Sequence, residues 1–259
     1  MNANNYICSI LFRLDILGRC LAAAWALVAI VLSQLPPLHL LIRPKRLDVE
    51  VHSRIGITHK VGNPNASVVV SIRNTGGREL RVRGLSLDIS RDGKPLLGLP
   101  AQNYFETPSS KSAVLFVPFS LKPGETWAHS VAFLDLFDRL TEKQFRENLS
   151  ALDSDIRRKI RARADDDKQA VLGEQKLVQP FIQMFEKLFV WFPGEYLAEL
   201  KVNAEPGSAS YSKKYRFTLY ESDTADLRQH LDDYPFGGGL TYDTERHSGV
   251  NIPLTEHVV

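Results

Sequence analysis

The sequence predicts a mainly β protein: an antiparallel sandwich with an α-helical insertion and one N-terminal transmembrane helix. Three features predict this fold class: an uncharged apolar segment near the start, repeated two-residue alternation of apolar and polar residues, and one stretch with helical periodicity in between. Of the 259 residues, 44% are hydrophobic and 24% are charged, as in globular chains. The expected organisation is a tail (1–19), a membrane anchor (20–42), a sandwich (47–222) with a helical insertion (138–190), and a short helix with an extended tail (223–259).

The apolar segment from Cys20 to Ile42 has no formal charge and is followed by a basic cluster. About 20 apolar residues cross a hydrocarbon core of about 30 Å as a helix, so the segment is long enough for a single-pass anchor. A cleaved signal peptide is the alternative, but the apolar run continues past any plausible cleavage site. A lipoprotein signal is excluded because Arg19 precedes Cys20 where a small residue is required.

The side of the membrane on which the domain lies depends on two arguments that disagree. More Lys and Arg residues follow the segment than precede it, which favours a cytoplasmic domain. Proteins with one N-terminal span and a large C-terminal domain usually export that domain. We expect an extracytoplasmic domain and keep the cytoplasmic-facing arrangement as the alternative.

The strands after the anchor are predicted from alternation. Leu47, Val49 and Val51 alternate with polar residues, and the pattern recurs around 66–74 and 80–91 with turn residues between them. At Gly84 the apolar positions change from even to odd numbers, which predicts a β-bulge. Later alternating segments bring the expected number to around seven strands, as in an antiparallel sandwich.

Three motifs occur in this order along the chain: "VSIRNTGGREL", "LKPGETW" and "PGEYLAELKV". Together they resemble bacterial immunoglobulin-like adhesion modules of the CARDB kind over about residues 47–222. The resemblance implies an immunoglobulin-like sandwich outside the cytoplasm, at the bacterial inner membrane, that binds or spaces and rarely catalyses. Tyr196 then takes the position of a corner tyrosine with a structural hydroxyl. The helical insertion departs from the family pattern.

The insertion is predicted to begin with a capping box of Thr141 and Gln144. Its last part repeats apolar residues every three or four positions, which indicates a broad apolar helix face. This apolar face either packs on the sandwich or contacts a partner. The part of the insertion before it carries a basic run, which either forms ion pairs with acidic residues of the same helix, as a self-paired surface, or contacts a partner. The hypothetical partner-binding residues are Phe181, Phe185, Phe189, Arg157, Arg158 and Arg161.

Charge and residue usage exclude several kinds of site. The formal net charge is +2, too near balance to predict a nucleic-acid partner. Both cysteines, Cys8 and Cys20, lie in or before the apolar segment, so the domain has no disulfide, thiol nucleophile or Cys-ligated zinc. The seven histidines follow no metal-binding or catalytic spacing. We therefore expect no catalytic residue, metal or cofactor, and no enzyme activity.

The function expected from these observations is that of a non-catalytic, single-pass membrane-anchored binding or scaffolding protein of an envelope assembly with a protein partner. A membrane-tethered sensor that binds a small molecule or lipid is one alternative, and an enzyme of unrecognised type is another. The oligomeric state and the partner's identity do not follow from the sequence.

Overall fold

The structure is a computed structural model that describes residues 25–26, 29–30, 33, 44–107, 110, 112–163, 169–240 and 249–257. The chain divides into two compact units. The first comprises residues 1–44 with 76–78, and the second comprises residues 45–75 with 79–259.

In the first unit, Trp25, Ala26, Ala29, Ile30 and Ser33 have helical backbone, and the Ser33 hydroxyl donates to the Ile30 carbonyl over 2.7 Å. The predicted tail (1–19) and most of the predicted anchor (20–42) lie outside the described residues. Among the helices that the structure does describe, none combines the length and the hydrophobicity needed to span a membrane.

The second unit is mainly β with antiparallel pairing throughout, which confirms the coarse fold class. The strand order is β10-β1-β2-β7-β4-β3-β8-β9-β11, with β5 added to β4 and β6 to β3. Its described part holds eleven strands, more than the seven expected, because several are short. They are β1 (Leu47–Lys60), β2 (Asn63–Asn74), β3 (Leu80–Arg91), β4 (Lys94–Phe105), β5 (Val114–Leu115), β6 (Phe119–Leu121), β7 (Thr126–Leu134), β8 (Gly194–Glu205), β9 (Tyr211–Leu219), β10 (Val250–Pro253) and β11 (Thr255–Glu256).

The strands form two sheets joined at both sides. β4 pairs with β3 over its first half and with β7 over its second half, so it passes from one sheet to the other. β10 and β11 are separated by Leu254 alone, and they pair with β1 and β9 respectively. Inward residues of both sheets belong to one hydrophobic core, so the two layers bury a common interior.

Local sequence signals account for the irregularities of the strands. The pairing of β3 with β8 shifts register between Val82 and Gly84, which confirms the bulge predicted from the change of phase. Two tight turns join β1 to β2 at Val61-Gly62 and β3 to β4 at Asp92-Gly93. In both turns the two residues have positive φ, as a two-residue type I′ hairpin requires.

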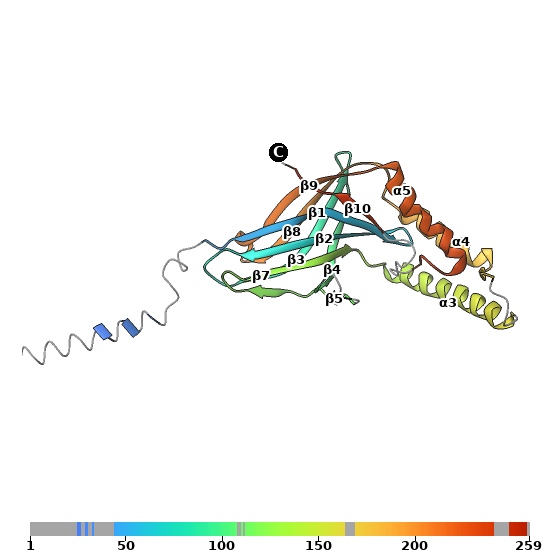
Figure 1. The fold of residues 1–259 in the computed structure, drawn as a ribbon, viewed down its shortest axis with the longest axis horizontal. Helices are drawn as coiled ribbons and strands as arrows, with labels where there is room; N and C mark the ends of the chain where they lie inside the picture. Colours follow the sequence, from blue (N-terminus) through green and yellow to red (C-terminus); the bar gives the residue numbers. More distant parts are fainter. Residues whose placement is uncertain are drawn as a thin grey trace, which may run out of the picture. The chain divides into compact units, whose positions relative to one another are not determined.

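The helices of this unit, α3 (Arg139–Ala162), α4 (Gln175–Leu188) and α5 (Glu221–Arg228), gather at one end of the sheets (Figure 1). Two 3-10 helices, η1 (Gly207–Ala209) and η2 (Gln229–Phe236), follow β8 and α5. α3 and α4 lie between β7 and β8, within the stretch predicted to be helical.

The predicted start of the insertion is wrong in detail. α3 is capped by Asp138, whose carboxylate accepts hydrogen bonds from the backbone amides of Leu140 and Thr141, in place of a Thr141–Gln144 box. A carboxylate can accept two of the free amides in the first turn, so it begins the helix earlier. Pro180 lies inside α4, which continues through it as one helix.

The three sequence motifs occupy junctions of the fold. Asn74 donates from its backbone amide to the Glu125 carbonyl over 3.0 Å, and its carbonyl accepts from the Gly124 amide over 2.8 Å. The first two motifs therefore meet. In the third motif the Tyr196 hydroxyl donates to the Phe192 carbonyl over 2.7 Å, which is the structural role expected for it.

Candidate functional site

The three phenylalanines predicted to bind a partner are buried. Phe181 and Phe185 have no exposed surface, and Phe189 has 4%. Phe181 lies edge-on to Phe145 of α3, and Phe185 stacks on Phe189. Side chains packed in this way are not available to a partner, so the structure favours the alternative in which this helix face packs within the fold.

The three arginines, in contrast, lie on the exposed side of α3. Arg157 pairs with Asp153 over 2.7 Å, and Arg158 pairs with the buried Asp155, which also binds Lys159 over 2.7 Å. The self-paired surface that the sequence offered as an alternative is therefore present along this part of α3. Arg161 is exposed, and a role for the arginines in binding remains a prediction.

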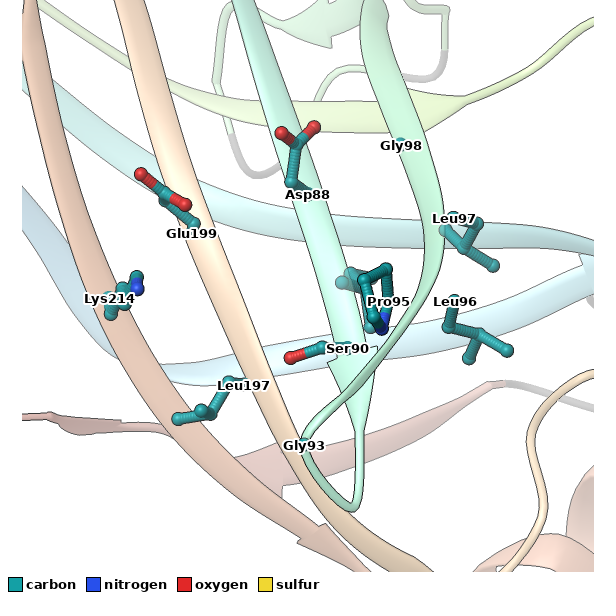
Figure 2. A pocket seen from close by; sticks show the side chains of 11 residues that line it. Asp88, Ser90, Gly93, Pro95, Leu96, Leu97, Gly98, Leu197, Glu199 and Lys214 are labelled. Atoms are coloured by element: carbon teal, nitrogen blue, oxygen red, sulfur yellow. The ribbon is translucent and has the colours of Figure 1, made fainter.

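A groove of about 660 Å³ lies on the outer face of the sheet formed by β4, β3, β8 and β9 (Figure 2). Strand pairing places residues of this groove in two rows. One row crosses all four strands and runs Gly98, Asp88, Glu199, Lys214, and the next crosses three strands and runs Pro95, Ser90, Leu197.

The first row holds two carboxylates and one lysine, and Lys201 supplies a second cation beside it. Asp88 and Glu199 face each other across β3 and β8, an arrangement that is unfavourable unless cations offset it. Lys201 donates to Asp88 over 2.6 Å, and this hydrogen bond is the main reason that the pKa of Lys201 is raised above its ordinary value. Lys214 stands opposite Glu199 on β9.

The second row and the neighbouring β4 turn make the groove apolar at one end. Leu197 is half-buried on β8, and Leu96 and Leu97 come from β4. Figure 2 shows the Leu96 and Leu197 side chains projecting from strands on either side of Ser90. The groove thus combines an apolar part with a polar row, a composition common to binding sites.

The edge of the sheet beside the groove is formed by the first half of β4. Lys94 to Pro100 of β4 pair with β3 on one side, and within the described residues no strand pairs with Lys94 to Leu99 on the other side. Pro95 and Pro100 interrupt this edge, a common way to limit uncontrolled strand addition.

The described residues that line the groove include neither histidine nor cysteine; its ionisable side chains are Asp88, Glu199 and Lys214. Over the described parts of the chain, no three His, Cys, Asp or Glu residues are arranged to hold a metal ion. His129 on β7 is half-buried and contacts the Glu106 carbonyl through Nδ1 over 3.2 Å.

Two sets of residues were missed from the sequence. The groove residues are outward positions of four strands, and only the register between strands brings Asp88 and Glu199 together. The second set is a pair of buried histidines, His59 and His230, whose ring centroids are 4.5 Å apart. For His59 a signal existed, because it precedes a Gly turn at the end of an alternating strand.

No protein-family model matches the sequence, and no curated protein is similar enough to it to count as a relative.

Proposed function

We propose that the second unit is an immunoglobulin-like sandwich. The order β1-β2-β7-β4 corresponds to strands A, B, E and D of that fold, and β3-β8-β9 corresponds to C, F and G. Tyr196, near the start of β8, has the hydrogen bond of a corner tyrosine. The helical insertion then lies between strands E and F, and the tail strands β10 and β11 are additions.

We further propose that this sandwich is a non-catalytic binding module that holds an extended segment of a partner protein. The observation that carries the proposal is the edge of β4 from Lys94 to Leu99, which no described strand pairs and which runs beside the groove. A peptide added to such an edge gains main-chain hydrogen bonds, and alternate side chains can enter neighbouring pockets. Leu96 and Leu197 would contact an apolar side chain of that segment.

The setting of this module follows the sequence prediction. With residues 20–42 as a single-pass anchor, the domain would stand at a membrane surface and join other proteins of an envelope assembly. The extracytoplasmic side is the proposed location. A C-terminal reporter that is active only on one side of the membrane decides between this arrangement and its alternative.

Site-specific photo-crosslinking tests the binding proposal. A photoreactive residue at position 96, in the full chain within native membranes, should give one discrete protein adduct. Position 69 on β2, an exposed valine on the other sheet, is the matched control and should give none. Peptide mapping of the adduct should identify a short segment of the partner.

A second change tests whether the groove itself is used. Leu197→Arg, at a half-buried outward position, should reduce the adduct from position 96 about tenfold or more, since a buried apolar contact is worth more than 1 kcal/mol. Unchanged circular dichroism serves as the folding control. Equal adducts from positions 69 and 96, or an adduct that Leu197→Arg leaves intact, would contradict the proposal.

A further inference from the structure

The turn between β1 and β2 packs against α4 of the helical insertion. Val61 has no exposed surface although it has a φ of 50°, a strained conformation for a β-branched residue. A Cβ atom on Gly62 would lie 2.6 Å from the Phe185 carbonyl oxygen and 2.9 Å from its Cα atom. The turn therefore touches the backbone of α4, and the packing around it maintains the strain.

His59 connects this turn to α5 through both of its ring nitrogens. The Gly62 backbone amide donates to Nδ1 over 3.2 Å, so Nδ1 must hold a lone pair. Nε2 lies 2.9 Å from the Leu227 carbonyl oxygen, which can only accept, so Nε2 must carry the proton. The two hydrogen bonds thus require one neutral tautomer of His59.

The surroundings of His59 are mostly aromatic. Its ring centroid lies 5.1 Å from that of Phe185, 5.7 Å from that of Phe189 and 4.5 Å from that of His230. Burial lowers the pKa of His59 below its ordinary value of 6.5, and the hydrogen bond to Leu227 acts in the opposite direction. The neutral form is accordingly the folded form at neutral pH.

Charged and titratable groups lie on every element around this cluster. The Arg228 guanidinium at the end of α5 lies 5.3 Å from the Phe185 centroid and pairs with Glu186 of α4. Lys60 of β1 pairs with Glu142 of α3 over 3.9 Å. From η2 come His230, Asp233 and Tyr234, all buried.

We propose that His59 is a pH-sensitive latch that holds the β1–β2 turn against α4 and releases it when the ring binds a proton. A proton taken from solvent at Nδ1 turns this acceptor into a donor that faces the Gly62 amide, also a donor. That hydrogen bond is lost, and an imidazolium is created beside a second imidazole in an apolar cluster. The turn and α4 then separate locally, which relieves the strain at Val61 and exposes Phe185 and Phe189.

The direction of the response follows from linkage. In the latched state His59 is a neutral ring whose pKa is lowered below 6.5. In the released state the ring is no longer buried, so its pKa returns to the ordinary value of about 6.5. The latch is fully closed above pH 6.5 and weakens as the pH falls from 6.5 toward the lowered pKa. In that window one bound proton increases the released fraction by up to about tenfold per pH unit.

Hydrogen exchange of the full chain in detergent micelles tests the proposal. After correction for intrinsic exchange, amides around Gly62 and in the second half of α4 should lose protection between pH 7 and pH 5. The amides of β3 and β8, which do not contact the latch, should keep theirs. Protection at Gly62 and α4 that is unchanged down to pH 5 would overturn the proposal.

His59→Gln distinguishes titration from general acid sensitivity. Its side-chain oxygen can still accept from Gly62 and its amide group can donate to Leu227, but it cannot be protonated in this range. The variant should stay closed at both pH values, while His129→Gln, the matched control on β7, should respond as the wild-type chain does. A pH response retained in His59→Gln would also overturn the latch.

A spectroscopic readout of the unsubstituted chain keeps the test informative if His59→Gln does not fold. Imidazole nitrogen NMR should find the Nε2–H tautomer of His59 at pH 7. Its titration should coincide with the loss of protection at Gly62. The Nδ1–H tautomer, or a titration separate from that loss, would contradict the proposal.

Discussion

At Tyr196, one hydroxyl fixes the point where the chain leaves the helical insertion and begins β8. The side chain has no exposed surface, its ring stacks on Phe217 at 4.9 Å between centroids, and its hydroxyl donates to Phe192. Burial is the main reason that the pKa of this hydroxyl is raised above 10.0, so the residue stays neutral and donates. The hydroxyl connects a buried ring to the chain just before β8, which makes this bond a stability determinant.

Tyr196→Phe should therefore lower the free energy of unfolding by about 1–2 kcal/mol, because it keeps the ring and removes only the hydroxyl, which contacts the Phe192 and Val190 carbonyls. Urea unfolding followed by circular dichroism measures this difference. Tyr104→Phe is the control, since Tyr104 is half-buried on β4 and packs on Trp127 through its ring. Equal stability losses in both variants would show that the Tyr196 hydrogen bond has no special role.

At the scale of elements, the two tight hairpin turns share a conformation and differ in surroundings. Val61-Gly62 has φ values of 50° and 82°, and Asp92-Gly93 has 49° and 77°. A Cβ atom on Gly62 would meet the backbone of Phe185, whereas one on Gly93 would have nothing within 4 Å. A comparison of the two turns therefore separates the conformational cost of a side chain from the cost of displacing α4.

Gly93→Ala should cost about 1–2 kcal/mol of unfolding free energy, the ordinary penalty for an L-residue with positive φ. Gly62→Ala carries the same penalty and should cost about 1–3 kcal/mol more, because α4 must shift to admit the methyl group. Thermal and urea unfolding of the two variants, measured side by side, provide the comparison. Similar losses in both would mean that α4 yields to the methyl group without cost.

Local periodicity accounts for what the sequence predicts well at this scale. The bulge at Gly84 depends on neighbouring residues only, so the change of phase in the apolar pattern reveals it. The N-cap at Asp138 was missed because several polar residues near that point could cap the start of a helix. The groove and the histidine pair could not be read from local patterns, because Asp88 and Glu199, like His59 and His230, meet only once the strands and helices are paired.

At the scale of the second unit, the end of the helical insertion is tied to the end of the groove. The Asp92 amide donates to the Glu195 carbonyl over 2.9 Å, and the Arg91 guanidinium lies 5.5 Å from the centroid of Phe192. The chain between Phe189 and Glu195 therefore links the surroundings of His59 to the β3–β4 turn. Under our two proposals, the separation of α4 from the β1–β2 turn at low pH would displace this segment. The displacement would in turn move the β3–β4 turn at the end of the groove.

The division of the chain into two units leads to a prediction about the whole molecule. Residues 45–75 and 79–259 contain all of the described residues of the common core, so a chain that begins at Lys45 should fold without the apolar segment. The full chain should remain in membranes after alkaline carbonate extraction, and the shortened chain should appear in the supernatant.

Charges placed in the apolar segment should produce the same release without shortening the chain. Leu27→Asp together with Ile30→Asp adds two carboxylates, each of which costs about 2.5–3.5 kcal/mol at the centre of a membrane helix. These changes lie outside the second unit, so the hydrogen-exchange protection of β3 and β8 should not change. If the doubly substituted chain stays with the membrane, the domain itself must bind the membrane or an integral partner, and the apolar segment is not the anchor. If it leaves the membrane with its sheets intact, anchoring and binding reside in separate units, as the sequence predicts.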